Sequence, residues 1–410
     1  MRMRSALLFI LLWLLALAGP AHAQTPPQPP APPPTTPGRT TPRVAGADCA
    51  LWEIPAAYDT AYDAECGYVR VPERRDGAAQ QTIQIAYLRL RSATTEPAPP
   101  VIFLAGGPGD SGIDGLSSSA GLVNALLATR DVVALDQRGT GHSIPSLNCI
   151  EWIDAAAELP LEETSAAELI GCRDYWREQG YDVAAYTTAE NAADVVDVAD
   201  ALGYTQVLLL GESYGTKLAQ VIMRRYPDRV VAAVLDGAVP VELNQEVEQL
   251  PKMAYAFERV FALCTADQAC AAYYPNLGER FYALVARLDA EPLVLTVGEG
   301  GGRREETVRG IDLVTALFIH LIQGSYAVAE LPYRVMQLEK GDTAYLAQLY
   351  AEWDWVDPLW GTGMNLTVHC SEEIMLANEA EYNAALAAYP SLEAAQRSAS
   401  PTKYADLLAG

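Results

Sequence analysis

A serine between two glycines is the residue of this chain best placed for nucleophilic chemistry. Ser213 lies in the pentapeptide Gly211-Glu212-Ser213-Tyr214-Gly215, after an apolar run at 207–210 and before a helical pattern at 216–225. A serine on a tight strand-to-helix turn needs small neighbours, because a nearby Cβ would clash with the turn. The following helix points its N-terminal amides at the serine and favours negative charge there. A chance match in a glycine-rich loop is the alternative; the flanking patterns favour a nucleophile that forms an acyl-enzyme.

A second glycine-rich loop supplies candidate partners for this serine. Gly106–Gly109 follows the apolar strand predicted at 100–104, and its three glycines let backbone approach a reacting group closely. The tetrahedral intermediate of acyl transfer carries an oxyanion, and we expect the amides of Tyr214 and Gly107 to donate to it. The alternative for this loop is an ordinary turn. Both loops follow strands that are predicted to be parallel, so they should meet at one edge of the sheet.

The elements that position these loops alternate between strands and helices. Strands are predicted at 67–72, 81–90, 100–104, 131–136, 207–210 and 229–235. A helix that starts at Thr187, with Glu190 at capping-box spacing, should end near Gly203. The pattern predicts an α/β fold, with a mostly parallel sheet and helices on both faces.

Helical patterns dominate after residue 240. They are predicted at 247–263, 279–288, 311–322, 331–338 and 343–353, with a glycine-rich turn at 298–304. We interpret 47–240 as the core and 241–410 as an inserted helical lid. A separate helical domain is the alternative for the second region.

The N-terminus has the pattern of an export signal. Arg2 and Arg4 precede an apolar stretch at 5–19, and Ala21-His22-Ala23 fits a cleavage site. The apolar stretch is short for a membrane span, which favours a cleaved signal peptide over 1–23 rather than an uncleaved anchor. The segment 24–46 is rich in proline and threonine and is predicted to be an extended linker. We therefore expect a secreted or periplasmic protein.

Charge and cysteine content narrow the function further. The chain has 52 acidic and 28 basic residues and a net charge of −24, which disfavours nucleic acid and anionic membrane as partners. No histidine–cysteine cluster has zinc spacing and no phosphate loop is present, so neither a metal nor a cofactor is expected. In an oxidising compartment the seven cysteines should pair with near neighbours, although spacing alone does not fix the connectivity. The expected pairs are Cys49–Cys66, Cys149–Cys172 and Cys264–Cys270, which leaves Cys370.

Three motifs in one order carry a resemblance to a known family. Gly106–Gly109, Asp136–Ser143 and Gly211–Gly215 together resemble the proline iminopeptidase family of α/β-hydrolases, especially its exported tripeptidyl aminopeptidase-like branch. The resemblance covers about residues 47–380, and the segment 368–373 is also similar. It implies a secreted serine exopeptidase that removes N-terminal residues or short peptides from substrates with a free N-terminus. It says nothing of oligomeric state.

The resemblance also implies that acidic lid residues bind the substrate's α-amine. Glu372 and Glu373 are the candidates at the matching segment. A free ammonium group needs a carboxylate partner, and either acid could supply it. The alternative is that both are solvated surface acids, as expected for most acidic residues in a chain that has 52 of them.

The catalytic histidine is the difficulty in this interpretation. In this fold the triad runs serine, acid, histidine along the chain, and only His320 and His369 follow Ser213. His320 lies in an apolar helical stretch. His369 could be combined with Asp354 or Asp357, but no convincing strand pair separates them.

Asp136, Arg138 and His142 are expected to be structural, with His142 as catalytic base the alternative. His142 precedes the serine and follows the wrong strand for this fold, and Arg138 should pair with carboxylates beneath the site. We therefore expect the acid and histidine, together with a partner for Cys370, to lie beyond residue 410. Residues 1–410 alone should then be inactive. An esterase on the same fold and a non-catalytic homologue are the competing hypotheses.

Overall fold

The computed structural model describes residues 44–52, 62–76, 81–117, 120–149, 166–298, 303–352 and 359–387, with residues 389 and 392. These residues all belong to one compact unit, Thr41–Gly410. The predicted signal peptide and nearly all of the predicted linker lie outside the described residues.

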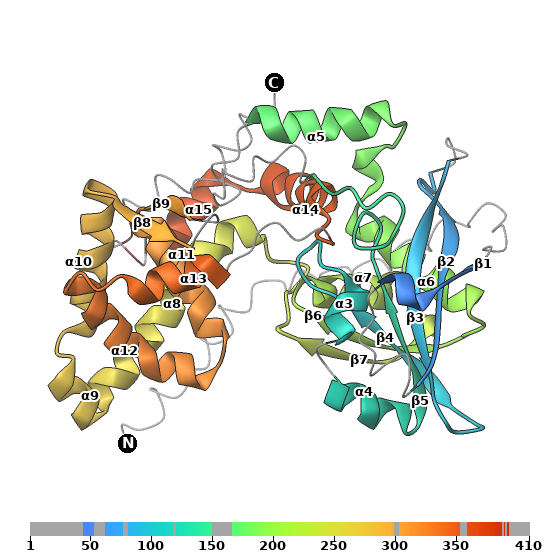
Figure 1. Cartoon of the computed structure of the whole chain (residues 1–410), viewed down its shortest axis with the longest axis horizontal. Helices are drawn as coiled ribbons and strands as arrows, with labels where there is room; N and C mark the ends of the chain where they lie inside the picture. Colours follow the sequence, from blue (N-terminus) through green and yellow to red (C-terminus); the bar gives the residue numbers. More distant parts are fainter. Residues whose placement is uncertain are drawn as a thin grey trace, which may run out of the picture. The chain divides into compact units, whose positions relative to one another are not determined.

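A seven-stranded sheet carries the loops singled out from the sequence (Figure 1). Its spatial order is β1-β2-β3-β5-β4-β6-β7. The four strands β5, β4, β6 and β7 pair in parallel, whereas β1, β2, β3 and β5 pair antiparallel. The predicted parallel arrangement therefore holds for the half that bears the motifs. The strands are β1 (Val44–Ala47), β2 (Asp63–Pro72), β3 (Thr82–Arg91), β4 (Ala98–Leu104), β5 (Arg130–Leu135), β6 (Val207–Glu212) and β7 (Val230–Asp236).

Helices cover both faces of this sheet, as the sequence predicts. Along β5, Val133 and Leu135 belong to the apolar cluster that includes α6 and α7, whereas Val132 and Ala134 belong to the cluster of α3 and α4. This alternation follows from the two-residue period of a strand, and it explains why the buried part of β5, residues 132–135, is entirely apolar. The helices are α3 (Gly112–Ser117), α4 (Ala120–Leu127), α5 (Ala166–Glu178), α6 (Thr188–Ala201) and α7 (Tyr214–Arg225).

The predicted start of α6 is confirmed in detail. Thr187 is its N-cap, and its side chain accepts a hydrogen bond from the amide of Glu190. Gly203 follows the last turn with a φ of +85°, a conformation in which glycine ends a helix without steric cost.

The region after β7 has its own apolar core. The rings of Phe257, Phe261 and Phe281 lie at its centre, with centroids 4.6 Å apart for Phe257 and Phe281. All five helices predicted there are present. A hairpin of β8 (Leu293–Val297) and β9 (Arg304–Val308) was not predicted, because only its turn had a clear sequence signal. The helices are α8 (Gln245–Ala266), α9 (Gln268–Tyr273), α10 (Leu277–Ala290), α11 (Gly310–Ile322), α12 (Ser325–Glu339) and α13 (Ala344–Glu352).

The chain then continues through short helices. These are α14 (Thr362–Val368), a π-helical turn η5 (His369–Glu373), η6 (Ile374–Leu376) and α15 (Glu379–Leu386). Met364 and Val368 of α14 are buried in the same apolar cluster as α6 and α7 of the sheet region. The segment therefore packs on the core although it follows the helical region in sequence. No helix in the described ranges is both long and apolar enough to cross a membrane.

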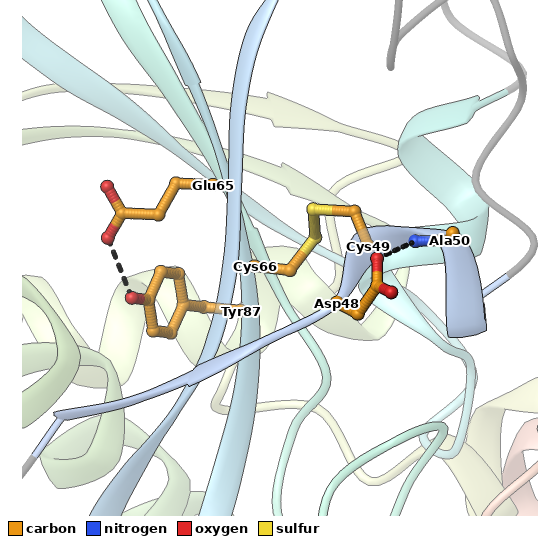
Figure 2. Close-up of a disulfide and its surroundings, with 6 residues drawn as sticks. All are labelled: Asp48, Cys49, Ala50, Glu65, Cys66 and Tyr87. Atoms are coloured by element: carbon orange, nitrogen blue, oxygen red, sulfur yellow. Dashed lines mark hydrogen bonds between the residues drawn. A yellow bond between two sulfur atoms is a disulfide. The ribbon is translucent and has the colours of Figure 1, made fainter.

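The three predicted disulfides are all present. Cys49 and Cys66 join the short helix η1 (Cys49–Trp52) to β2, with 5.3 Å between their Cα atoms (Figure 2). Cys149–Cys172 and Cys264–Cys270 have Cα separations of 5.6 and 5.1 Å. Beside the first disulfide, the hydroxyl of Tyr87 donates to Glu65 at 2.9 Å.

Candidate active site

Ser213 lies on a tight turn between β6 and α7. Its φ of 50° and ψ of −120° are rare for a residue with a side chain, and the residue is exposed. The glycines on either side have the steric role predicted for them. A Cβ on Gly215 would lie 2.0 Å from the carbonyl oxygen of Leu104, and one on Gly211 would lie 2.5 Å from that of Gly215. The turn is a nucleophile elbow in its geometry.

The loop after β4 lies directly against this elbow. A Cβ on Gly106 would be 3.1 Å from the Cβ of Ser213, and Gly107 has a φ of +98°. Tyr214 is the first residue of α7, so its amide precedes the hydrogen-bonded ladder of that helix. The structure thus brings both predicted oxyanion donors, the amides of Tyr214 and Gly107, to the neighbourhood of the serine. Their role as donors stays a prediction.

The acid of the second motif is buried and fully engaged. Asp136 accepts hydrogen bonds from the Ser111 hydroxyl at 2.7 Å and from the amides of Ile113 and His142 at 3.0 and 2.7 Å. Burial raises the pKa of Asp136, and the hydrogen bonds from His142, Ile113 and Ser111 act against that rise. These contacts hold the loop together, as predicted for a structural motif.

Arg138 forms the buried pairing that was predicted for it. Its guanidinium donates to Asp194 at 2.7 and 2.9 Å and to the carbonyls of Glu73 and Ala185, each at 2.7 Å. Arg75 pairs with the same carboxylate at 2.6 Å. Sequence reasoning named neither Asp194 nor Arg75, since both come from elements remote in the chain.

Two of the described histidines, His142 and His320, have structural surroundings. His142 stacks on Trp52 with ring centroids 5.1 Å apart. His320 lies in the core of the helical region, 2.6 Å from the hydroxyl of Tyr345, and burial lowers its pKa. His369 opens the turn η5. Within the described ranges the Ser213 hydroxyl makes no hydrogen bond, and the earlier candidates Asp354 and Asp357 lie outside these ranges.

The two lid acids lie against the elbow helix rather than in open solvent. Lys217, one turn into α7, forms an ion pair with Glu373, whose carboxylate also accepts from the amide of Gln245 at 2.8 Å. Glu372 accepts from the amide and hydroxyl of Thr188 at 2.8 and 2.7 Å. The same hydroxyl lies 2.8 Å from that of Tyr214, the residue after the nucleophile.

Lys217 and Thr188 were missed from the sequence. Lys217 had one usable signal, since its spacing places it one turn beyond Tyr214 on the predicted elbow helix. Thr188 had none, because only the fold brings its helix beside η5. Burial and the nearby Glu372 raise the pKa of Tyr214 and keep its phenol protonated.

Comparison with known families agrees with the sheet and the elbow. The model of the alpha/beta hydrolase fold matches residues 99–294, which contain the glycine loop, the Asp136 motif and Ser213. The chain therefore has the α/β-hydrolase fold that was predicted.

Its relatives include a peptidase and an esterase. The tripeptidyl aminopeptidase of Streptomyces coelicolor is 32% identical over 47% of this chain and 37% of its own length. Carboxylesterase B of Mycobacterium tuberculosis is 31% identical over 56% of this chain and 47% of its own length. A proline iminopeptidase-related protein from Thermus thermophilus is 22% identical over 47% of this chain and 50% of its own, with a TM-score of 0.30.

The match to the family model and the aminopeptidase relative confirm the resemblance predicted from the three motifs. The chain spans about half the length of the curated relatives that it matches, or less. What these relatives do as whole proteins is therefore a proposal for this one.

Proposed function

We propose that this protein is an exported serine hydrolase of the aminopeptidase type. Ser213 would attack the carbonyl carbon of the peptide bond that follows an N-terminal residue or short peptide. An ester with Ser213 forms as the C–N bond breaks, and the hydroxyl proton goes to the amine of the released peptide. Water then hydrolyses the ester, which frees the N-terminal product as an acid and restores the serine. The amides of Tyr214 and Gly107 would hold the oxyanion, and one such donor is typically worth about 3 kcal/mol of barrier. The observation that carries the proposal is an exposed serine at positive φ against the glycine loop.

Recognition of the substrate's amine is proposed for the two lid acids. Glu372 and Glu373 bring two carboxylates to the elbow helix, and Lys217, which pairs with Glu373 and lies 3.8 Å from Glu372, offsets only one of the two negative charges. A substrate ammonium group would supply the missing positive charge. Glu372 is the more exposed of the two, which makes it the better contact for the amine.

A fluorophosphonate probe, which reacts with activated serines, tests the first part. Labelling of the wild type and none of Ser213→Ala supports the proposal. Absence of labelling in both would contradict the proposed function and would favour a non-catalytic homologue.

Substrate pairs test the second part. An aminoacyl arylamide should be cleaved and its N-acetylated form should not. Glu372→Gln should raise KM for the free-amine substrate at least tenfold. Unchanged KM in both single variants and in Glu372→Gln/Glu373→Gln would contradict amine recognition. Hydrolysis of short-chain esters alone would favour the esterase alternative, which the relative named carboxylesterase B supports.

Export is part of the same proposal. The three disulfides agree with an oxidising compartment. The mass of the protein recovered outside the cytoplasm should correspond to a chain that starts at Gln24. A mass that includes residues 1–23 would contradict cleavage of the signal.

A further inference from the structure

We propose that Asn365 is a positioning residue for the oxyanion loop, an inference that rests on the serine-hydrolase function proposed above. Asn365 lies on α14 and is buried, with 4% of its surface exposed. Its side-chain amide donates to the carbonyl oxygen of Pro108 at 2.6 Å, across 257 positions of the sequence. Pro108 directly follows Gly107, the predicted oxyanion donor.

A second hydrogen bond, from the residue just before α14, holds the carbonyl of the residue after Pro108. The amide of Gly361 donates to the carbonyl oxygen of Gly109 at 2.9 Å. On the other side of the loop, the side-chain amide of Gln137 donates to the carbonyl of Ala105 at 3.0 Å. Carbonyls are therefore held both before and after Gly107. With its flanks fixed in this way, the peptide plane that carries the Gly107 N–H has little freedom to rotate.

The same segment also bridges the loop after β5. The amide of Gly141 donates to the carbonyl of Leu359 at 2.9 Å, and a Cβ on Gly361 would lie 2.1 Å from the carbonyl oxygen of Gly139. The indole of Trp360 lies against Gly109, where a Cβ would come within 3.1 Å of the ring. Leu359–Gly361 is thus wedged between the Asp136 motif and the glycine loop, and it sets where α14 presents Asn365.

The hydrogen bonding of Asn365 argues against a purely packing role. Its amide nitrogen is used by Pro108, whereas its Oδ1 is buried and has no hydrogen-bond partner in the described part of the chain. An unsatisfied buried acceptor opposes folding, so part of the stability gained from the hydrogen bond to Pro108 is lost again at Oδ1. Departures from polar satisfaction of this kind concentrate at functional sites. The residue also begins an Asn-Leu-Thr sequon, but the buried, donating amide leaves no room for a glycan.

Thr367 provides a matched control on the same helix. Its single hydroxyl hydrogen is shared between the carbonyls of Val183 and Gly363, at 3.1 and 2.9 Å, and neither acceptor belongs to the glycine loop. Thr367→Ala therefore removes a tertiary hydrogen bond of α14 without touching the loop that Asn365 holds. A general loosening of the helix would affect both variants alike.

The first experiment follows the loop itself and needs no activity. In the full chain, hydrogen exchange of the peptide that covers 104–112 should become at least tenfold faster in Asn365→Ala. It should change less than twofold in Thr367→Ala. Equal exchange in the two variants would overturn the proposal.

The second experiment follows the chemistry. Fluorophosphonate inactivation of Asn365→Ala should show a maximal rate 10- to 100-fold lower with unchanged probe affinity, and Thr367→Ala should match the wild type. A wild type that does not label contradicts the proposed function, and the exchange result still decides the role of Asn365. Faster loop exchange with an unchanged labelling rate would overturn the link to the oxyanion hole.

An isosteric variant separates hydrogen bonding from shape. The carboxylate of Asn365→Asp cannot donate to the Pro108 carbonyl, but the protonated acid can. Its labelling rate relative to the wild type should therefore be lowest at neutral pH and recover as pH falls through the pKa of the new acid, which burial raises. A ratio that does not change with pH would contradict the assigned hydrogen bond.

Discussion

Two loops on either side of β4 differ in how they use their polar groups. The loop after β5 has an acid, an arginine and a histidine, yet Asp136 and Arg138 are buried and bound within the fold. The elbow after β6 has an exposed serine at positive φ, and its hydroxyl makes no hydrogen bond among the described residues. The charged loop supports the site, and the strained loop presents a reactive group.

Substituting alanine for one side chain in each loop gives the strongest test of this comparison. Ser213→Ala should lower fluorophosphonate labelling at least about a thousandfold, because the nucleophile itself is removed. His142→Ala should stay within about threefold of the wild type, since its ring stacks on Trp52 and not on the serine. Labelling rates at matched probe concentration measure both. A His142→Ala protein as inert as Ser213→Ala would break the comparison.

The steric demand of the elbow predicts the largest loss of stability. Gly215→Ala places a Cβ 2.0 Å from the Leu104 carbonyl oxygen, so β4 and α7 must separate. We expect a loss of about 3–5 kcal/mol in urea unfolding. Gly46→Ala is the control, because nothing lies within 4 Å of its added Cβ. Similar stability of the two variants would show that the elbow is loosely packed.

Substitutions in the loop after β5 should lower the stability of the fold rather than the reactivity of the serine. Arg138→Met leaves the carbonyls of Glu73 and Ala185 without their donor and Asp194 with Arg75 alone. A loss of about 3 kcal/mol is expected, because removing one member of a buried pair leaves its partners unsatisfied.

The control for that variant is a partly exposed arginine. Arg74→Ala should cost less than about 1 kcal/mol, since Arg74 pairs with Asp182 near the surface. Chemical denaturation followed by tryptophan fluorescence measures both variants. Equal losses of stability would mean that the buried ion pair of Arg138 contributes no more to folding than a surface ion pair.

A cluster beside the first disulfide should give the smallest effect. Burial of Glu65 acts to raise its pKa, but the hydrogen bonds from Arg89, Arg91 and Tyr87 outweigh it and lower the pKa from 4.5 to about 2. The ionised form is thus favoured in the folded state, so its stabilisation is present above pH 4.5 and is lost as pH falls towards 2. Glu65→Gln should cost about 1–2 kcal/mol at neutral pH after allowance for solvent exposure.

The pH dependence makes that prediction specific. The difference between Glu65→Gln and the wild type should shrink as pH falls from 4.5 and vanish near pH 2. Asp63→Asn is the control, because its side chain is 77% exposed and lies 3.7 Å from Arg91. It should change stability by less than about 0.5 kcal/mol at any pH. A difference for Glu65→Gln that does not depend on pH would contradict the assigned ion cluster.

The elements around Ser213 were predictable because their signals are local. An apolar run, two small residues and a helical period lie within twenty positions, and they gave β6, the elbow and α7. The disulfides were predictable for the same reason, since each joins cysteines that are near neighbours in sequence. The capping of α6 by Thr187 needed only the residue three positions on.

The contacts between remote segments were not predictable from local patterns. In the sequence Asn365 is only the first residue of an Asn-Leu-Thr sequon, and no local pattern indicates that it contacts Pro108. Lys217 and Glu373 are 156 positions apart, and their ion pair exists only because η5 packs on α7. The hairpin of β8 and β9 was missed because its strands are short and one is charged. Such features follow from packing, which a periodic pattern does not encode.

The three disulfides have a consequence for fragment experiments. They link cysteines that are 17, 23 and 6 positions apart, so each disulfide connects residues within one short stretch of the chain. None of them crosses the connection between β7 and α8. A protease that cuts at residues 237–244 would therefore yield two polypeptides that separate on a denaturing gel even without a reducing agent, while the native protein would hold them together by packing and ion pairs such as Lys217–Glu373.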